Sequence, residues 1–413
     1  MSSAADTAAR LSAATSGLPA PVAVVDLDVF DTNALDILKR ADGVPVRVAS
    51  KSVRVRSLVE RALGHGFAGV MAYSLREALW LVGEGMRDVL VGYPTVDREA
   101  LAELAADPAA RAQVTLMVDD VAHLGLIADA VEAAGAAGAA GAGGAGGAQG
   151  AGGTPVQVCL DVDCSLRVGV GPLTAHLGVR RSPLREPGEV AALATVAQAK
   201  GLAVRGLMFY EAQVAGLPDT SPAVRVVKRL TMREVNDRRV RILAAVRDAV
   251  GHDVELVNAG GTGSIEVSGS APGVTEVTSG SGLFAPGLFD GYRSFESRPA
   301  AFFGLDVVRE PAPGWVTAFS GGYAASGQAG KARLPRIFTP GYTLSGTEGA
   351  GEVQTPLRAR RPDGGMLRTG DRVWLRHAKA GEMMERFDQV HLVRGTEVTE
   401  TVPTYRGEHK NFG

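Results

Sequence analysis

The chain has 413 residues, which is too long for one ordinary core and long enough for a large domain with a smaller one. Its formal net charge of −2 excludes a global field that attracts nucleic acid or an anionic membrane. Apolar residues make up 46% of the chain, but no unbroken apolar run is long enough to span a bilayer.

The N-terminal segment is rich in Ala and Ser and lacks the apolar stretch of a secretory signal, so we expect a disordered leader over residues 1–20. The chain has two cysteines, Cys159 and Cys164, which lie in one expected strand and its following turn. They are too close for a structural disulfide, and two cysteines make no disulfide framework. We therefore expect a reducing, cytoplasmic setting.

An apolar run at residues 22–27 and a helix at 32–40 lead into eight short apolar segments, each followed by a helical segment or a glycine-bearing turn. The segments are 46–49, 69–74, 88–94, 114–120, 156–163, 204–211, 254–261 and 274–281. Asp97 is placed to cap the helix after the third segment, and a long amphipathic helix is expected over 224–250. This alternation predicts parallel strands buried on both faces, in an α/β fold. Eight units match a closed (β/α)8 barrel better than an open doubly wound sheet, although the periodicity fits both.

Two further stretches define the domain organisation. Residues 133–153 are nearly pure Gly and Ala, and such a tract buries too little apolar surface to offset its ordering entropy. We expect a flexible insertion there. After residue 295 the helical periodicity fades and alternating β segments appear, punctuated by Pro and Gly. The sequence therefore predicts a barrel over residues 21–295 and a mostly β domain over 296–413.

Lys51 follows the first segment of the expected barrel, at the carboxyl end of the strand. Active sites collect at that end of strand-then-helix units. A desolvated lysine loses its proton more easily and can attack a carbonyl carbon to form a Schiff base. The alternative is a lysine on the barrel rim that only reaches solvent.

Two glycine-rich loops follow the seventh and eighth segments, NAGGTGS at 258–264 and TSGSG at 278–282. Glycines let a backbone approach a ligand closely, and Thr262, Ser264 and Ser281 add hydroxyl donors. Barrels often bind a phosphate group at the loops after strands seven and eight. The two loops together predict a phosphate site, although each alone is typical of an ordinary turn.

Polar side chains after the fifth and sixth segments are expected at the same face. Arg167 can donate to an oxyanion or a phenolate, and its alternative is a salt bridge to Asp163. The sixth segment ends in FYEAQ, where Tyr210, Glu211 and Gln213 offer polar groups. A lysine for a carbonyl, a cup for a phosphate and an arginine for a ring hydroxyl suit a phosphorylated aldehyde, and pyridoxal phosphate fits.

Several of these segments resemble the alanine racemase-like, fold-type III family of pyridoxal phosphate enzymes, and more narrowly its D-threonine aldolase and D-serine dehydratase branch. They are PVAVVDLDVFDTNALDIL, VRVASKS, LDVDCSLRVGV, FYEAQ, VNAGGTGS and EVTSGSG. The resemblance covers nearly the whole chain from Pro21 and implies a homodimer. It also implies a role for each site residue: a Schiff base at Lys51, phosphate binding by Gly261, Thr262, Gly280 and Ser281, a contact of Arg167 with the pyridine 3-oxygen, and Tyr210 near the ring.

The C-terminal domain departs from this branch, whose members usually hold a divalent metal with a histidine and, two residues later, a cysteine or aspartate. The matching run RVWLRHAKAGE has His377 and then Lys379, which on a strand would share one face. Lysine is protonated near neutral pH and is a poor ligand, so no metal site of the family's type is expected. One hypothesis is that the Lys379 ammonium replaces the metal and polarises the substrate hydroxyl. The others are a rearranged metal site of Glu382 and His377, and a structural role for His377 as a hydrogen-bonded core histidine.

The sequence therefore predicts a pyridoxal phosphate-dependent lyase for β-hydroxy amino acids, with Lys51, His377 and Lys379 as catalytic residues. The resemblance favours D-configured substrates. Aldolase cleavage to an aldehyde and glycine and deamination to ammonia and a 2-oxo acid both stay open. The branch tends to place a histidine near FYE, where this chain has Gln213, so the general base is His377 or the amine of Lys51. The alternatives are a racemase that uses Tyr323 or Tyr342, and a non-catalytic cofactor-binding protein.

Overall fold

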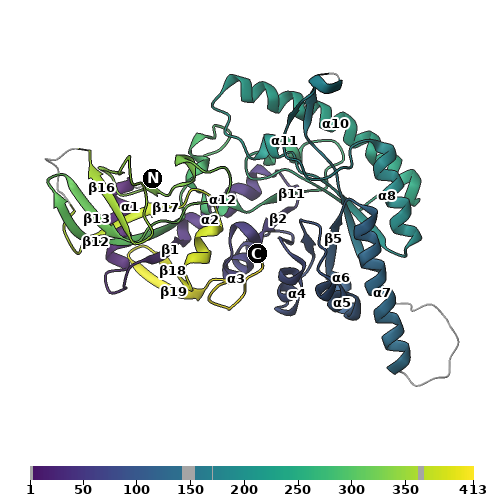
Figure 1. The fold of residues 1–413 in the computed structure, drawn as a ribbon, viewed down its shortest axis with the longest axis horizontal. Helices are drawn as coiled ribbons and strands as arrows, with labels where there is room; N and C mark the ends of the chain where they lie inside the picture. Colours follow the sequence, from purple (N-terminus) through teal and green to yellow (C-terminus); the bar gives the residue numbers. More distant parts are fainter. Residues whose placement is uncertain (1–2, 142–153, 170, 361–366) are drawn as a thin grey trace. The chain divides into compact units, whose positions relative to one another are not determined.

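The computed structural model describes residues 3–141, 154–169, 171–360 and 367–413 of the chain (Figure 1). It has two compact units, and each is discontinuous in sequence. Unit 1 consists of Met1–Asp36, Ser52–His65 and Gly280–Asn411, and unit 2 consists of Ile37–Lys51, Gly66–Ser279 and Phe412–Gly413.

Unit 2 contains a closed barrel of eight parallel strands. In barrel order these are β2 Val46–Ala49, β3 Val70–Ala72, β4 Val89–Val91, β5 Val114–Val118, β6 Gln157–Asp161, β9 Ala203–Phe209, β10 Leu256–Ala259 and β11 Glu276–Ser279. The barrel closes where Ser279 of β11 pairs with Val48 of β2. This confirms the predicted (β/α)8 barrel and its eight strands, and it excludes the open sheet. The strands are short and valine-rich because parallel strands are buried on both faces.

Helices follow the barrel strands as the alternating pattern predicts. They are α3 Arg56–Gly64, α4 Leu75–Gly83, α5 Arg98–Ala106, α6 Pro108–Gln113, α7 Val121–Gly141, α8 Pro187–Ala199, α9 Ala212–Ala215, α10 Pro222–Val250, α11 Ile265–Gly269 and α12 Ser281–Phe284. Asp97 caps α5 as predicted, and its carboxylate accepts a hydrogen bond from the Ala100 amide at 3.1 Å. The predicted Gly/Ala insertion begins inside α7, because alanine is the strongest helix former. Its remainder, residues 142–153, lies outside the described residues.

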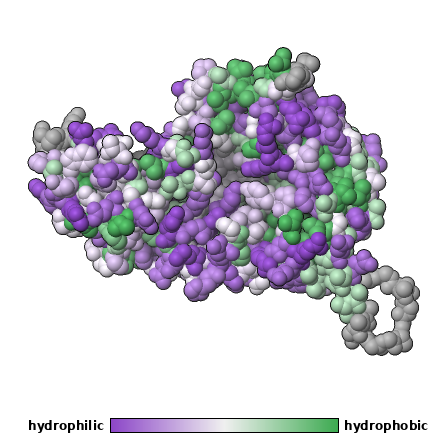
Figure 2. Space-filling model, in the orientation of Figure 1, coloured by the Kyte–Doolittle hydropathy of each residue, from purple (hydrophilic) through white to green (hydrophobic). Residues whose placement is uncertain are grey.

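An antiparallel hairpin, β7 Leu166–Val168 and β8 Ala175–Leu177, interrupts the strand-and-helix alternation after β6. It presents apolar side chains to solvent: Val168 is 51% exposed and Leu173 is 86% exposed. Figure 2 shows hydrophobic residues gathered on the surface near this hairpin. Cys159 of β6 and Cys164 before the hairpin are buried free thiols, and burial raises the pKa of Cys164.

Unit 1 is built on a nine-stranded, mostly antiparallel sheet, which confirms a mostly β domain separate from the barrel. Its strands are β1 Val22–Asp26, β12 Ala301–Ala312, β13 Trp315–Phe319, β14 Arg336–Ile337, β15 Tyr342–Leu344, β16 Gln354–Ala359, β17 Arg372–Arg376, β18 Gln389–Arg394 and β19 Glu397–Pro403. The fully buried strand β1 pairs with β12 and β18. The sequence predicts one boundary, between residues 295 and 296, whereas each unit of the structure is made of three separate segments. Unit 1 takes the first 36 residues, including most of α2 Leu27–Arg40, and resumes at Gly280.

The prediction of a disordered leader over residues 1–20 is wrong. Helix α1, Ala4–Ala14, begins with a capping box in which the Ser3 hydroxyl accepts a hydrogen bond from the Asp6 amide at 3.1 Å. Leu11 is fully buried in the core of unit 1, and the Trp374 indole donates to the Ser12 hydroxyl at 2.9 Å. An alanine-rich segment with one good cap and one buried leucine docks as a helix despite its low hydrophobicity.

Of the helices in the described ranges, none has the length and apolar character that crossing a bilayer requires.

Candidate active site

Lys51 lies where the sequence predicts it, in the 3-10 turn Ser50–Ser52 directly after β2. Its Nζ donates a hydrogen bond to the Tyr93 hydroxyl at 2.5 Å and lies 5.1 Å from the centroid of that ring. The Ser50 hydroxyl donates to the Met71 carbonyl at 3.0 Å and fixes the turn against β3. Tyr93 is absent from the residues predicted above. The signal that marks it is an aromatic residue two positions after a buried barrel strand.

Tyr210 follows β9, and burial raises the pKa of its hydroxyl to about 12. The guanidinium of Arg181 lies 5.4 Å from the Tyr210 ring centroid and 5.7 Å from the Tyr93 ring centroid. Unit 2 therefore brings together a lysine, two tyrosines and an arginine. Arg181 lies on the loop after the β7–β8 hairpin, and no local motif marks it.

Arg167 makes the salt bridge that the sequence analysis left open as an alternative. It lies on β7, is 43% exposed, and its Nη2 is 2.8 Å from Oδ2 of Asp163. The same carboxylate accepts a hydrogen bond from the Ser165 hydroxyl at 2.7 Å and lies 3.3 Å from Arg185. In unit 2, the arginine beside Tyr210 is thus Arg181, and Arg167 is bound to Asp163.

Two polar residues of FYEAQ face packed structure, so their expected place at the site face is wrong. Glu211 is fully buried, and its carboxylate accepts hydrogen bonds from the Gly260 amide at 3.0 Å and from the Ser268 hydroxyl. The Gln213 amide donates to the Cys164 carbonyl at 2.6 Å. Glu211 therefore stabilises the loop after β10, and the Gly260 amide and Ser268 hydroxyl supply the hydrogen bonds that a buried carboxylate requires.

The glycine loop after β10 folds tightly against its neighbours. Gly260 has φ +74°, which favours glycine, and a Cβ at Gly261 would lie 3.1 Å from the Cβ of Ala215. The Thr262 hydroxyl lies 2.8 Å from the Ser279 hydroxyl at the end of β11. Unit 2 therefore places a close-packed glycine turn and two adjacent hydroxyls at the loop for which the sequence predicts phosphate binding.

The second glycine loop passes into unit 1, where Gly280 precedes the short helix α12. The Ser281 hydroxyl lies 3.0 Å from the hydroxyl of Ser52, the residue after Lys51. Ser52 and Ser279 were not among the predicted site residues, although each adjoins one of them in sequence. Within unit 1, the Ser52 and Ser281 hydroxyls beside Gly280 can donate to a phosphate, so this pair fits the phosphate group of pyridoxal phosphate.

Two carboxylates end neighbouring barrel strands in unit 2. Burial, reinforced by the negative charge of Asp119, raises the pKa of Asp161 to about 7. Asp119 follows β5, and its Oδ1 lies 3.2 Å from Nδ1 of His123. Burial also raises the pKa of Asp119. At neutral pH, Asp161 is therefore protonated in a larger share of molecules than an ordinary aspartate is.

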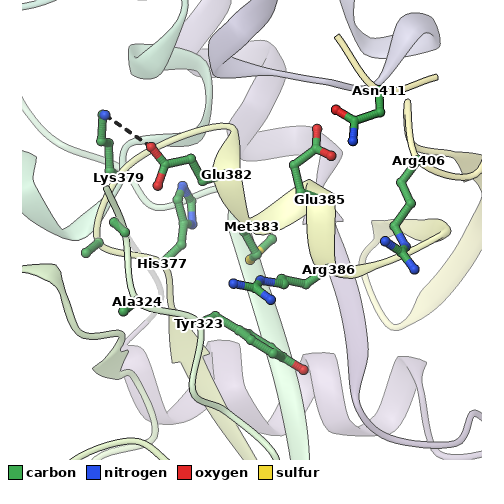
Figure 3. A pocket seen from close by; sticks show the side chains of 12 residues that line it. Tyr323, Ala324, His377, Lys379, Glu382, Met383, Glu385, Arg386, Arg406 and Asn411 are labelled. Atoms are coloured by element: carbon green, nitrogen blue, oxygen red, sulfur yellow. Dashed lines mark hydrogen bonds and ion pairs between the residues drawn. The ribbon is translucent and has the colours of Figure 1, made fainter. Parts of the chain in front are cut away.

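A pocket of about 360 Å³ in unit 1 contains the predicted C-terminal residues (Figure 3). Because β17 ends at Arg376, His377 and Lys379 follow the strand, and the prediction that they share one strand face is wrong. His377 is 3% exposed and packs edge-on against Phe284, with ring centroids 6.1 Å apart. Burial lowers the pKa of His377 to about 3. Within the described ranges, neither ring nitrogen has a well-formed hydrogen bond, although a backbone hydrogen bond with Ala301 works against the lowering of the pKa.

Lys379 forms an ion pair with Glu382, with Nζ and Oε1 3.1 Å apart (Figure 3). Its Nζ also donates to the Ser326 hydroxyl at 2.7 Å. Burial works to raise the pKa of Glu382, but the hydrogen bonds from Ser326 and Lys379 outweigh it and lower the pKa. In the part of the chain that the structure describes, no three His, Cys, Asp or Glu side chains are grouped closely enough to hold a metal ion. His377, Lys379 and Glu382 do not fit a divalent metal, because the Lys379 ammonium is paired with the Glu382 carboxylate that would have to bind the metal.

No protein-family model matches the chain. A curated D-threonine aldolase from Arthrobacter sp is 26% identical over 362 residues, which cover 84% of this chain and 83% of that protein. Among solved structures, D-threonine aldolase from Filomicrobium marinum has a TM-score of 0.77 at 22% identity, covering 94% of this chain and 96% of that one. D-threo-3-hydroxyaspartate dehydratase from Delftia sp. HT23 has a TM-score of 0.69 at 20% identity, covering 94% and 98%. Alanine racemase from Bacillus anthracis has a TM-score of 0.61 at 14% identity, also covering 94% and 98%.

These likenesses define the class of protein: the chain has the alanine racemase-like, fold-type III architecture of a barrel and a mostly β domain. Within that class its likeness is to the D-threonine aldolase branch, which confirms the resemblance noted in the sequence.

Proposed function

We propose that the protein is a pyridoxal phosphate-dependent lyase that acts on β-hydroxy amino acids and prefers D-configured substrates. The observation that carries the proposal is Lys51, which ends the first strand of a closed barrel with its amine held by the Tyr93 hydroxyl. The likeness to a D-threonine aldolase over 84% of the chain supports it. When bound, pyridoxal phosphate supplies an electron-withdrawing ring that weakens the bonds to the α-carbon of an amino acid.

Several residues would hold the cofactor. Lys51 would bond to its aldehyde carbon, Tyr210 would lie near its ring, and the segments Gly261–Thr262 and Gly280–Ser281 would bind its phosphate. We assign the contact with the ring 3-oxygen to Arg181 in place of Arg167, because Arg181 lies over the Tyr210 ring and Arg167 is bound to Asp163.

Lys379 is the residue that we assign to the substrate hydroxyl. Its ammonium is held by Glu382 and Ser326, so it can donate a charge-assisted hydrogen bond without a metal ion. A cation near a hydroxyl favours loss of the hydroxyl proton. The proton acceptor that we favour is the amine of Lys51 rather than His377, because a group with a pKa of about 3 is a weak base at neutral pH.

Aldolase cleavage is the favoured reaction, because the curated relative is a D-threonine aldolase. In that reaction, loss of the hydroxyl proton leads to an aldehyde and glycine. Deamination is the second candidate, supported by the likeness in fold to a hydroxyaspartate dehydratase. In that reaction, loss of the α-proton and the hydroxyl leads to ammonia and a 2-oxo acid.

A racemase, the other enzyme class that the sequence leaves open, would need a tyrosine base. Both candidate hydroxyls are hydrogen-bonded, that of Tyr342 to the Leu367 amide at 2.7 Å and that of Tyr323 to the Ser320 hydroxyl at 3.0 Å, so neither tyrosine is favoured as that base.

Borohydride labelling tests the cofactor assignment independently of turnover. Protein loaded with pyridoxal phosphate is reduced, digested and analysed by mass spectrometry. We expect the label on Lys51, no label in Lys51→Ala, and unchanged labelling in Lys200→Ala, which alters an exposed lysine at the end of α8. Labelling of Lys51→Ala equal to that of the unsubstituted protein would overturn the assignment.

A substrate panel then tests the reaction. D- and L-β-hydroxy amino acids are supplied, and glycine, aldehyde, ammonia, 2-oxo acid and inverted amino acid are each measured. Metal content and the effect of a chelator are measured on the same preparation, and we expect turnover without bound metal. Loss of activity on chelation, restored by a divalent cation, would refute the role of Lys379. Gel filtration tests the homodimer that the family resemblance implies.

A further inference from the structure

The pocket of unit 1 is lined by five charged side chains, and all but one belong to ion pairs with a partner inside that unit. The pairs are Lys379 with Glu382 at 3.1 Å, Glu385 with Arg54 at 2.7 Å, and Arg406 with Asp388 at 2.9 Å. The remaining charge is the guanidinium of Arg386. His377 adds no charge near neutral pH, because burial lowers its pKa to about 3.

Arg386 ends the 3-10 helix Glu382–Arg386 and is held in place by an aromatic ring rather than by a carboxylate. Its guanidinium lies 6.0 Å from the Tyr323 ring centroid and extends between Met383 and Tyr323 (Figure 3). Tyr323 is itself fixed, since its ring packs against Phe303 with centroids 4.9 Å apart. A cation–π contact orients a guanidinium but leaves its positive charge uncompensated. Within the described residues, the Arg386 side chain has this ring contact but no ion pair or hydrogen bond.

We propose that Arg386 binds a carboxylate on the side chain of the substrate, so that the preferred substrates are β-hydroxy amino acids with a second acidic group. This inference rests on the proposed function, in which Lys379 of the same pocket binds the β-hydroxyl. The β-carbon carries both the hydroxyl and the rest of the side chain, so the group next to the hydroxyl enters this pocket. A guanidinium matches a carboxylate with two parallel hydrogen bonds.

The size of the pocket supports a short side chain. At about 360 Å³ it lies near the lower limit of ligand pockets, which start at about 300 Å³. The competing assignment gives Arg386 the α-carboxylate, which every amino acid carries. The two assignments differ in how the loss of Arg386 acts on acidic and neutral substrates.

The test compares 3-hydroxyaspartate with threonine, in the D configuration, on the protein loaded with pyridoxal phosphate. We expect a higher kcat/KM for the acidic substrate in the unsubstituted protein. Arg386→Met should lower kcat/KM about 30- to 100-fold for the acidic substrate and less than about threefold for threonine, since the lost contact is a charge pair. Arg406→Met is the matched control, because that guanidinium lines the same pocket but is bound to Asp388. We expect it to change neither value more than about threefold.

A binding measurement separates failure of this inference from failure of the proposed function. Calorimetry measures the binding affinity of the same loaded proteins for D-aspartate and D-alanine, which lack the reacting hydroxyl. If no β-hydroxy amino acid is turned over but D-aspartate binding weakens in Arg386→Met alone, the carboxylate site stands and the lyase proposal fails. If threonine is cleaved and Arg386→Met changes kcat/KM by the same factor for both substrates, the inference is overturned. If Arg386→Met lowers kcat/KM equally for the acidic and the neutral substrate, Arg386 binds the α-carboxylate. If it lowers neither value, Arg386 is a solvated arginine without a role in binding.

Discussion

Arg47 offers a direct test of how the barrel positions Lys51. It lies four residues before Lys51 on β2, is 1% exposed, and its guanidinium bonds to groups at two other barrel strands. Nε and Nη2 lie 2.7 and 2.8 Å from the Glu276 carboxylate, at the start of β11. Nη2 also lies 2.7 Å from Oδ2 of Asp88, just before β4. The strands that lead to Lys51, Tyr93 and Ser279 are therefore tied together inside the barrel.

The structure sets the expected size of the effect of Arg47→Met. Removing one partner of a buried ion pair costs about 3–5 kcal/mol, because the other charge is left uncompensated. Asp88 keeps Arg205 at 2.7 Å, so the stranded group is Glu276, which retains a hydrogen bond from Asn258 at 2.5 Å. We therefore expect the lower part of that range, about 3 kcal/mol. For a unit of this size the melting temperature should fall by roughly 6–12 °C.

Urea unfolding followed by near-ultraviolet circular dichroism measures the loss of free energy. Arg76→Met is the matched control, since that side chain is 49% exposed and pairs with Asp97 and Glu99 at the surface of the same unit. A surface pair contributes about 0–1 kcal/mol. Replacing Arg47 and Glu276 together by methionine should recover part of the loss, because no buried charge is then unpaired. If Arg47→Met is no more destabilising than Arg76→Met, the reasoning is wrong.

Three further predictions concern pH and cofactor affinity. The folded pKa of His377 lies below its unfolded value, so this group removes stability as pH falls below about 6.5. His377→Phe should thus reduce the loss of unfolding free energy between about pH 7 and 5 by up to about 2 kcal/mol, and equal slopes in urea titrations would contradict this. The folded pKa of Asp161 is raised to about 7, so stability falls as pH rises from about 4 to 7; Asp161→Asn should flatten that fall, and an unchanged slope would count against it. Gly261→Val should weaken pyridoxal phosphate binding about tenfold in an absorbance titration, because its Cβ would crowd Ala215, whereas Gly269→Ala, with 3.6 Å to the nearest atom, should not.

The barrel and Lys51 could be predicted because their signals are local. Each strand is a short apolar run ended by a glycine or a polar residue, and the repeat of eight such runs limits the fold. The position of Lys51 at the end of β2 follows from the run before it. The paired glycine loops are equally local, and their hydroxyl neighbours Ser52 and Ser279 differ from predicted residues by one position.

Other features depend on partners far away in the sequence. Helix α1 is stabilised by Trp374, which lies 362 residues from Ser12, and no window around residue 12 contains that information. Glu211 is written beside Tyr210 but bonds to the Gly260 amide 49 residues later. Whether a polar residue at a strand end serves a ligand or a neighbouring loop is decided by such contacts, which periodicity does not contain.

The charged residues of the unit 1 pocket show why this matters for function. Lys379 and Arg386 lie seven positions apart in one polar segment, and the sequence offers Glu382 and Glu385 as partners for either cation. In the structure, Glu382 forms an ion pair with Lys379, and Glu385 forms one with Arg54, which lies 331 positions from Glu385 in the sequence. A long-range ion pair thus removes the carboxylate that would neutralise Arg386, and the cation left over is the one with electrostatic affinity for an anionic substrate. Substrate preference at this pocket follows from which pairs form within it, so Arg54→Met should free Glu385 to compete with the substrate for Arg386.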